Sequence, residues 1–215
     1  MIRASICVVL LCCPLLALAQ DVNLNRDLLQ AARGGHEAVV RALLDQGASP
    51  DSRNRLGDAP LNTAARNGHT AMAMLLIERG ANVNLPNLAG VTPLMSAAFN
   101  GSLPLVRALL ARKAELNAAD RVKKTALVYA AGNGHAEVVG LLLDAGVGVN
   151  ARYDNELTAL MWAAAYGQDA AVTLLIGRGA DASARDNRGK TALDLAQEGG
   201  HRSTAELLRG ASGGS

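Results

Sequence analysis

The sequence predicts an all-α solenoid of about six helix–turn–helix repeats, because the same residue types recur every 33 residues. One column of the repeat holds threonine, at Thr92, Thr125, Thr158 and Thr191. Another holds glycine, at Gly35, Gly68, Gly101, Gly134, Gly167 and Gly200. Aromatic residues make up only 2% of the chain, so the predicted core consists of alanine, leucine and valine. A repeat of this length buries its apolar face only against neighbouring copies.

Each repeat is predicted to contain two helices. The first opens on the column threonine as N-cap, and Pro60 and Pro93 stand at its first position, where a missing N–H is tolerated. The repeat glycine ends this helix, and a second, apolar helix then runs to a further glycine such as Gly146. Lys113 takes that last position in the third repeat, where a non-glycine residue costs on the order of 1 kcal/mol. We therefore expect the third repeat to be the least stable joint.

These residues resemble the ankyrin repeat, whose signature Thr-Pro-Leu-His-x-Ala is matched at residues 92–97 (TPLMSA) and 59–64 (APLNTA). The resemblance covers about Asn25 to Gly210. The motif histidine is absent from every copy, where Asn62, Met95, Val128, Met161 and Asp194 stand instead. The resemblance implies turns that project as short β-hairpin fingers. It also implies a concave groove, lined by the fingers and the first helices, that binds other proteins.

The predicted domain organisation is a signal peptide at 1–19, a repeat domain at 20–210 and a flexible tail at 211–215. The repeats fall at about 26–53, 54–86, 87–119, 120–152, 153–185 and 186–210. Residues 20–26 form a short polar lead-in to the first repeat.

The first residues have the pattern of a secretory signal, with the positive Arg3, an apolar run and the small-x-small sequence Ala17-Leu18-Ala19. The apolar run is too short to span the roughly 30 Å hydrocarbon core of a membrane. We expect cleavage after Ala19 and export to a bacterial periplasm, with secretion as the alternative. All three cysteines lie in this leader, so the mature chain is predicted to carry no disulfide and no thiol site.

No residue pattern predicts catalysis, a cofactor or a metal. The four histidines each follow the repeat glycine, and equivalent positions of packed helices lie about 10 Å apart, too far for shared metal ligation. The sequence contains no phosphate loop, nucleophile elbow or zinc-protease helix. We therefore predict a protein that is not an enzyme, and a hydrolase or small-molecule binder is disfavoured.

Charge favours a protein partner with an acidic face. The formal net charge of +2 falls to +1 without Arg3, which argues against bulk binding to nucleic acid or to a membrane surface. The five fingers implied by the resemblance, at residues 53–58, 86–91, 119–124, 152–157 and 185–190, together carry +4. The groove side is therefore predicted to be basic, and the back acidic.

The resemblance, carried over by register, places the partner-binding residues on the fingers and just before the repeat glycine. The predicted set comprises Arg55, Leu56, Arg66, Leu88, Val91, Phe99, Arg121, Val122, Lys124, Arg152, Leu157, Tyr166, Arg188 and Lys190. Exposed apolar residues among charged ones are typical of contact sites. Tyr129 and Trp162 share a column with Thr63 and Ser96 that faces neighbouring helices, and both are predicted to be core residues.

The predicted function is an exported, non-enzymatic module that binds a folded protein partner in its concave groove. It would act as an inhibitor or antitoxin, or as support for an envelope enzyme such as one handling oxidative stress. The alternative is a self-associating structural or assembly protein. Oligomeric state and the identity of the partner are left open by the sequence.

Overall fold

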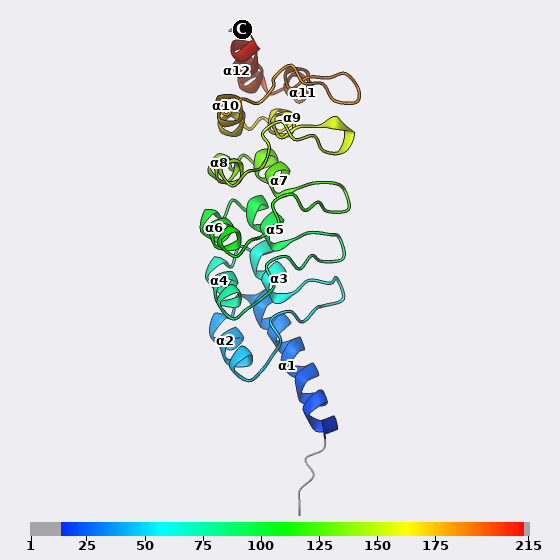
Figure 1. The fold of residues 1–215 in the computed structure, drawn as a ribbon, viewed down its shortest axis with the longest axis vertical. Helices are drawn as coiled ribbons and strands as arrows, with labels where there is room; N and C mark the ends of the chain where they lie inside the picture. The colour runs from blue at the N-terminus through cyan, green and yellow to red at the C-terminus, as the bar shows by residue number, and fades with distance from the viewer. Residues whose placement is uncertain (1–13, 213–215) are drawn as a thin grey trace, which may run out of the picture.

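The computed structural model describes residues 14–212, which form a helical solenoid as predicted (Figure 1). The helices follow one another in pairs, one pair for each repeat. Their bounds are α1 (Pro14–Gly34) and α2 (Glu37–Asp45), α3 (Pro60–Arg66) and α4 (Thr70–Glu78), α5 (Pro93–Phe99) and α6 (Leu103–Ala111), α7 (Ala126–Gly132) and α8 (Ala136–Asp144), α9 (Ala159–Ala165) and α10 (Asp169–Gly177), and α11 (Ala192–Glu198) and α12 (Arg202–Ser212).

The helices stack in two columns. The odd-numbered helices, which come first in each repeat, pack one on the next and form an inner column. The even-numbered helices form an outer column beside it (Figure 1). The fingers project from the side of the inner column that is remote from the outer helices. Side chains on the inner helices and on the fingers therefore share one surface of the solenoid.

The core is built from residues that repeat in register. The outer helices contribute one column of buried leucines, at Leu43, Leu76, Leu109, Leu142, Leu175 and Leu208. The inner helices contribute pairs of buried alanines, at Ala64 and Ala65, Ala97 and Ala98, Ala130 and Ala131, and Ala163 and Ala164. Because alanine carries only a Cβ, neighbouring inner helices approach closely without leaving voids between them.

The column threonines cap the inner helices, with one exception. The Oγ1 atoms of Thr92, Thr158 and Thr191 each accept the backbone N–H three residues later, at 3.3 Å. Thr125 makes no such bond, and its buried hydroxyl interacts with that of Tyr153. The start of α7 therefore lacks the cap that three other inner helices have.

The finger β-hairpins expected from the resemblance are not confirmed, because no strand occurs within residues 14–212. Each finger is a tight loop closed by at least two backbone bonds, such as those from the N–H of Asn54 to the carbonyl of Asp58 at 3.0 Å and from the N–H of Gly57 to the carbonyl of Asn54 at 2.9 Å. In four fingers a side-chain oxygen accepts the N–H groups two and four residues later, from Asn54, Asn87, Asp120 and Asp186. These amides are therefore bonded to a side chain and do not form a strand ladder.

Within the described residues, three of the four junctions between neighbouring fingers contain one backbone hydrogen bond from finger to finger, and the fourth contains none. The N–H groups of Leu88, Arg121 and Asn187 donate to the finger before them, at 2.9–3.0 Å. No such bond joins the third and fourth fingers among the described residues. The fourth finger instead contains a short 3₁₀ helix, η1 (Asp154–Glu156), in which Asn155 and Glu156 have φ of 57° and 61°.

Both ends of the chain differ from the predicted boundaries. The predicted lead-in at 20–26 lies inside α1, and the predicted tail begins inside α12, which extends to Ser212. The predicted signal peptide lies partly outside the described residues, which begin at Pro14. Residues 213–215 of the predicted tail also lie outside them.

Two of the four histidines that follow the repeat glycines contact a backbone carbonyl of the preceding inner helix. Nε2 of His135 lies 2.8 Å from the carbonyl oxygen of Phe99, and Nε2 of His201 lies 3.1 Å from that of Ala165. Gln168 takes the same position in the fifth repeat and donates to the carbonyl of Gly132 at 3.2 Å. These three side chains join their repeats to the end of the preceding inner helix.

Lys113 has the left-handed conformation expected at its position, with φ of 60°, so Lys113→Gly is predicted to stabilise the protein by about 1 kcal/mol. Urea unfolding followed by circular dichroism measures this change. Gly146→Ala is the matched control, because the equivalent Gly146 has φ of 106° and an added Cβ would meet nothing within 4 Å. The control is expected to lose a similar amount, for conformational reasons alone. An unchanged midpoint for Lys113→Gly would show that the third repeat carries no strain at this joint.

Candidate protein-binding groove

Two adjoining hollows lie between the fingers and the inner helices, and together they are called the groove here. The aromatic hollow has a volume of about 260 Å³ and is lined by Phe99, Lys124, Val128, Tyr129, Gly132, Asn133, Trp162 and Tyr166. The arginine hollow has about 220 Å³ and is lined by Arg66, Val91, Met95, Ser96, Phe99 and Tyr129. Phe99 and Tyr129 line both, so this pair forms the wall that the two hollows share.

The rings of the aromatic hollow contact one another in two pairs. Trp162 and Tyr166 are stacked, with ring centroids 5.9 Å apart and planes at 9°. Phe99 and Tyr129 meet edge to face, with centroids 5.9 Å apart and planes at 77°. Both arrangements are favourable for aromatic rings. The four rings come from three successive repeats, so the hollow exists only because the repeats stack.

Lys124 from the third finger lies against two of these rings. Its Nζ is 4.4 Å from the ring centroid of Trp162 and 5.7 Å from that of Tyr129. Asp120, in the same finger, is buried and accepts a 2.6 Å hydrogen bond from the Tyr129 hydroxyl. Burial is the main cause that raises the pKa of Tyr129, and the hydrogen bond to Asp120 and the charge of Asp120 raise it further. The hydroxyl therefore stays protonated and donates to Asp120.

Arg66 and Asp58 form a bidentate ion pair beside the arginine hollow. The two Nη–Oδ distances are 3.0 Å and 2.9 Å, and Asp58 is fully buried whereas 43% of the Arg66 side chain is exposed. Asn87 and Asn54 also donate to the same carboxylate. Burial alone would raise the pKa of Asp58, but the hydrogen bonds from Arg66 and Asn87 outweigh it and lower the pKa below its usual value.

The predicted binding residues fall into three groups. Those that are exposed are Arg55, Leu56, Arg66, Leu88, Phe99, Arg121, Val122, Arg152, Tyr166 and Arg188. Val91 and Leu157 are half-buried and pack against the core, and Lys124 and Lys190 are half-buried as well. The groove gathers only Arg66, Val91, Phe99, Lys124 and Tyr166 of this set. The remaining residues lie on the fingers outside it.

The prediction that Tyr129 and Trp162 are core residues is only partly right. Both are half-buried, and Tyr129 does pack against the core, but both rings line the groove. Thr63 and Ser96 in this column are small and buried, whereas the larger rings extend farther into the groove. The increase in size from Thr63 and Ser96 to Tyr129 and Trp162 is the signal in the sequence that could have identified them.

Three of the nine basic residues on the fingers pair with a carboxylate, and two of these acids are already included in the net charge of +4. Arg188 pairs with the buried Asp186 at 2.8 Å, Arg152 pairs with Glu156 at 3.2 Å, and Lys190 contacts Glu198 of α11. In the third finger, by contrast, Arg121, Lys123 and Lys124 have no carboxylate partner among the described residues. Unpaired positive charge therefore concentrates beside the aromatic hollow.

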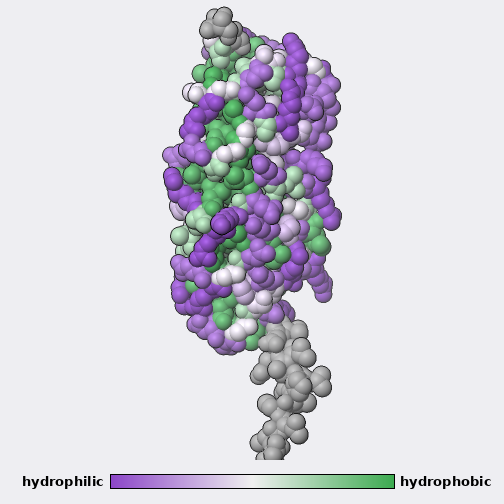
Figure 2. All heavy atoms as spheres, viewed as in Figure 1, coloured by the Kyte–Doolittle hydropathy of each residue, from purple (hydrophilic) through white to green (hydrophobic). Residues whose placement is uncertain are grey.

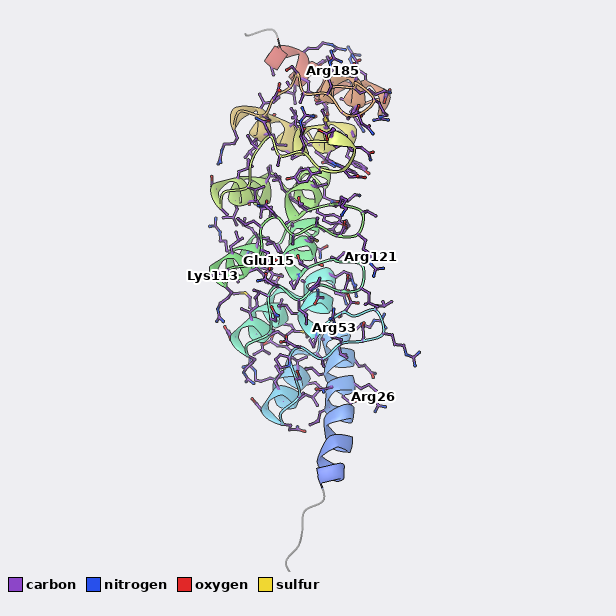
Figure 3. The ribbon with its side chains drawn as sticks, turned by 45° about the vertical axis from the view of Figure 1, so that its right-hand side comes forward. Arg26, Arg53, Lys113, Glu115, Arg121 and Arg185 are labelled. Carbon is purple, nitrogen blue, oxygen red and sulfur yellow. The ribbon has the colours of Figure 1, made fainter. Side chains whose placement is uncertain are left out.

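The surface views agree with this distribution. Figure 3 shows Arg53, Arg121 and Arg185 spread along the finger side of the solenoid, with Lys113 at the opposite edge. On the face drawn in Figure 2 the finger edge is mainly hydrophilic, and hydrophobic residues form a band along the long axis nearer the outer helices. The fingers therefore present a mainly hydrophilic edge to solvent.

Asp58→Asn is predicted to lower the stability at pH 7 by about 1.5–3 kcal/mol, because the amide cannot accept every hydrogen bond that the carboxylate accepts. The pKa of Asp58 is lower in the folded protein than in the unfolded chain, where it is about 3.9, so the ionised carboxylate stabilises the folded state above that pH. This stabilisation is lost as the pH falls through the folded pKa. The variant should therefore lose less stability than the native chain between about pH 5 and pH 3.

Urea unfolding at several pH values measures both effects. The control is Asp45→Asn, which removes an exposed pair with Arg79 and should change stability by less than about 1 kcal/mol. Asp169, Asp181, Asp186 and Asp194 also have lowered pKa values, so part of the acid dependence persists in the variant. An acid dependence identical to that of the native chain would exclude Asp58 as a contributor.

Comparison with known proteins agrees with this architecture. A family model described as ankyrin repeats in three copies matches residues 28–120 and again residues 127–214. No curated protein matches the chain significantly. Within residues 14–212, no helix is both long enough and apolar enough to cross a membrane, and no cluster of three or more potential metal ligands occurs. Because the family model matches most of the chain, the chain belongs to the ankyrin-repeat family, whose repeats are typically non-enzymatic modules for protein–protein interaction.

Proposed function

We propose that this protein is an exported, non-enzymatic module that binds a folded protein partner in its groove through an acidic, partly apolar face of that partner. One observation carries the proposal, namely that the aromatic hollow adjoins the finger with the most unpaired positive charge. Binding hot spots are enriched in aromatic residues and arginine and are surrounded by polar residues. The groove has this composition within a chain that is otherwise poor in aromatic residues.

The positive charge and the rings have different roles in this proposal. Arg121 and Lys123 are exposed, and they would steer an acidic partner toward the groove and raise the association rate. Phe99 and Tyr166, which are 49% and 54% exposed, would lose most of their remaining contact with water in the complex and slow dissociation. Salt should therefore weaken association more than it changes the lifetime of the complex.

The effect on the partner follows from where the chain acts. If it is exported, it would inhibit an enzyme that reaches the same compartment, as an antitoxin does, or support a resident envelope enzyme such as one handling oxidative stress. Export is supported by the positive Arg3, the apolar run and the Ala17-Leu18-Ala19 sequence.

Export makes a direct prediction about mass. Protein purified from the periplasm of the expressing cell should begin at Gln20, with a mass lower than the full chain by residues 1–19. Intact-mass spectrometry and N-terminal sequencing measure this. Ala17→Arg with Ala19→Arg places large charged side chains at the small-x-small positions and should leave the precursor uncut. A native chain recovered uncut in the cytoplasm would exclude the periplasmic proposal.

Capture from periplasmic extract tests the groove itself. The native chain from Gln20 onward should retain a partner that is lost when Phe99→Ala, Tyr166→Ala and Arg121→Glu are combined, because these changes remove two rings and reverse one charge. The matched control combines Met74→Ala, Leu207→Ala and Arg107→Glu on the outer helices, where these residues are also exposed. It changes charge equally and should retain the partner.

Identical capture by the native chain and the groove variant would place the contact elsewhere. Self-association is the second candidate, favoured by the exposed apolar fingertips Leu56, Leu88 and Val122. Size exclusion with light scattering distinguishes the two functions, since a stable dimer that Phe99→Ala disrupts would support self-association.

A further inference from the structure

We propose that the partner anchors itself by inserting one large apolar side chain into the aromatic hollow while a carboxylate next to it in the partner pairs with Lys124. This inference rests on the proposed function and names the chemistry of the contact. The occupant is thus a surface segment in which a residue such as phenylalanine or leucine is flanked by aspartate or glutamate.

The size of the hollow suits one side chain. Its volume of about 260 Å³ is below the roughly 300–1,000 Å³ of pockets that hold drug-sized ligands. The space exists because Gly132 stands where the neighbouring repeats have Phe99 and Ala165. A Cβ at Gly132 would lie 3.7 Å from the Tyr166 ring, so a methyl group just fits and a longer side chain would occupy the hollow itself.

The charge of the hollow suits a carboxylate. The ammonium of Lys124 lies over the Trp162 ring and has no carboxylate partner among the described residues. Asp120 is the acidic residue of the same finger, and its two oxygens already accept the Tyr129 hydroxyl and two backbone N–H groups. Arg121 and Lys123 are exposed on this finger and add positive charge, so an incoming carboxylate is attracted without displacing an internal acid.

A cationic occupant is the competing possibility, because aromatic clusters often bind ammonium groups. Here the face of Trp162 is already covered by the ammonium of Lys124. A second cation would meet a like charge at short range, in a site where the nearest internal carboxylate is already hydrogen-bonded. The geometry therefore favours an apolar group accompanied by negative charge over a lysine or arginine side chain.

The only tryptophan of the chain is Trp162, so its fluorescence reports directly on the hollow. We would titrate the native protein with three acetylated and amidated peptides: Gly-Asp-Phe-Asp-Gly, Gly-Lys-Phe-Lys-Gly and Gly-Asp-Ala-Asp-Gly. The first should change the Trp162 emission saturably, and the other two should bind at least tenfold more weakly. Equal or tighter binding of the lysine peptide, or no binding of the first peptide, would overturn the proposal.

Three variants separate the apolar and the ionic contact. Gly132→Leu fills the hollow from a helical position where leucine is favourable, and should abolish binding of the first peptide. Lys124→Met keeps an unbranched chain on the rings without the charge, and should weaken binding at least tenfold. Lys124→Arg keeps the charge and should bind within a few-fold of native. Unchanged affinity in Gly132→Leu or Lys124→Met would contradict the proposed anchor.

The same variants distinguish failure of the anchor from failure of the groove. One outcome is that the variant with Phe99, Tyr166 and Arg121 changed loses the periplasmic partner, whereas Gly132→Leu and Lys124→Met both retain it. This would show that the groove binds the partner but that the proposed anchor chemistry is wrong. If the groove variant retains the partner, the proposed function fails even where the first peptide binds.

Discussion

The close packing of each inner helix on the next is the interaction on which the rest of the structure depends. Paired alanines such as Ala97 and Ala98 are fully buried at these contacts, and any larger side chain there would push two repeats apart. Since the helices of each described repeat pack mainly on those of the neighbouring repeats, the spacing set by alanine is passed along the solenoid. It places residues 33 positions apart beside one another and thereby fixes the distance between successive fingers.

Because the spacing is regular, residues at equivalent positions of successive repeats lie side by side, and differences between them shape the surface. At the end of the inner helices, Phe99, Gly132 and Ala165 follow one another in the same column, so a ring is followed by an open space. One turn earlier on the helix, the column grows from Ser96 to Tyr129. The result is a groove with an arginine ion pair at one end and four rings at the other, built on a backbone that barely changes from repeat to repeat.

The sequence was sufficient to predict the helices, because the period, the capping threonines and the glycines all act locally or between neighbours. It was not sufficient to predict the finger conformation, which depends on side chains such as Asn54 accepting the amides that a strand would use. A charge count for each finger also missed the contact between Lys190 and Glu198, since the acid lies on a helix outside the finger. The position of Trp162 in the repeat predicted that its side chain faces the neighbouring helices, but not that its ring extends into the groove.

Among the described residues, the aromatic hollow spans the one junction between neighbouring fingers that has no backbone hydrogen bond. Lys124 belongs to the third finger, whereas Trp162 and Tyr166 belong to the repeat of the fourth. At this junction Tyr153 replaces the asparagine or aspartate that stabilises the other fingers, and its buried hydroxyl interacts with that of Thr125. The width of the hollow is therefore set by the packing of α7 on α9 and not by finger bonds. Lys124 bridges the two repeats by resting on Trp162, so the same residue that carries the charge also helps to hold the two walls of the hollow together.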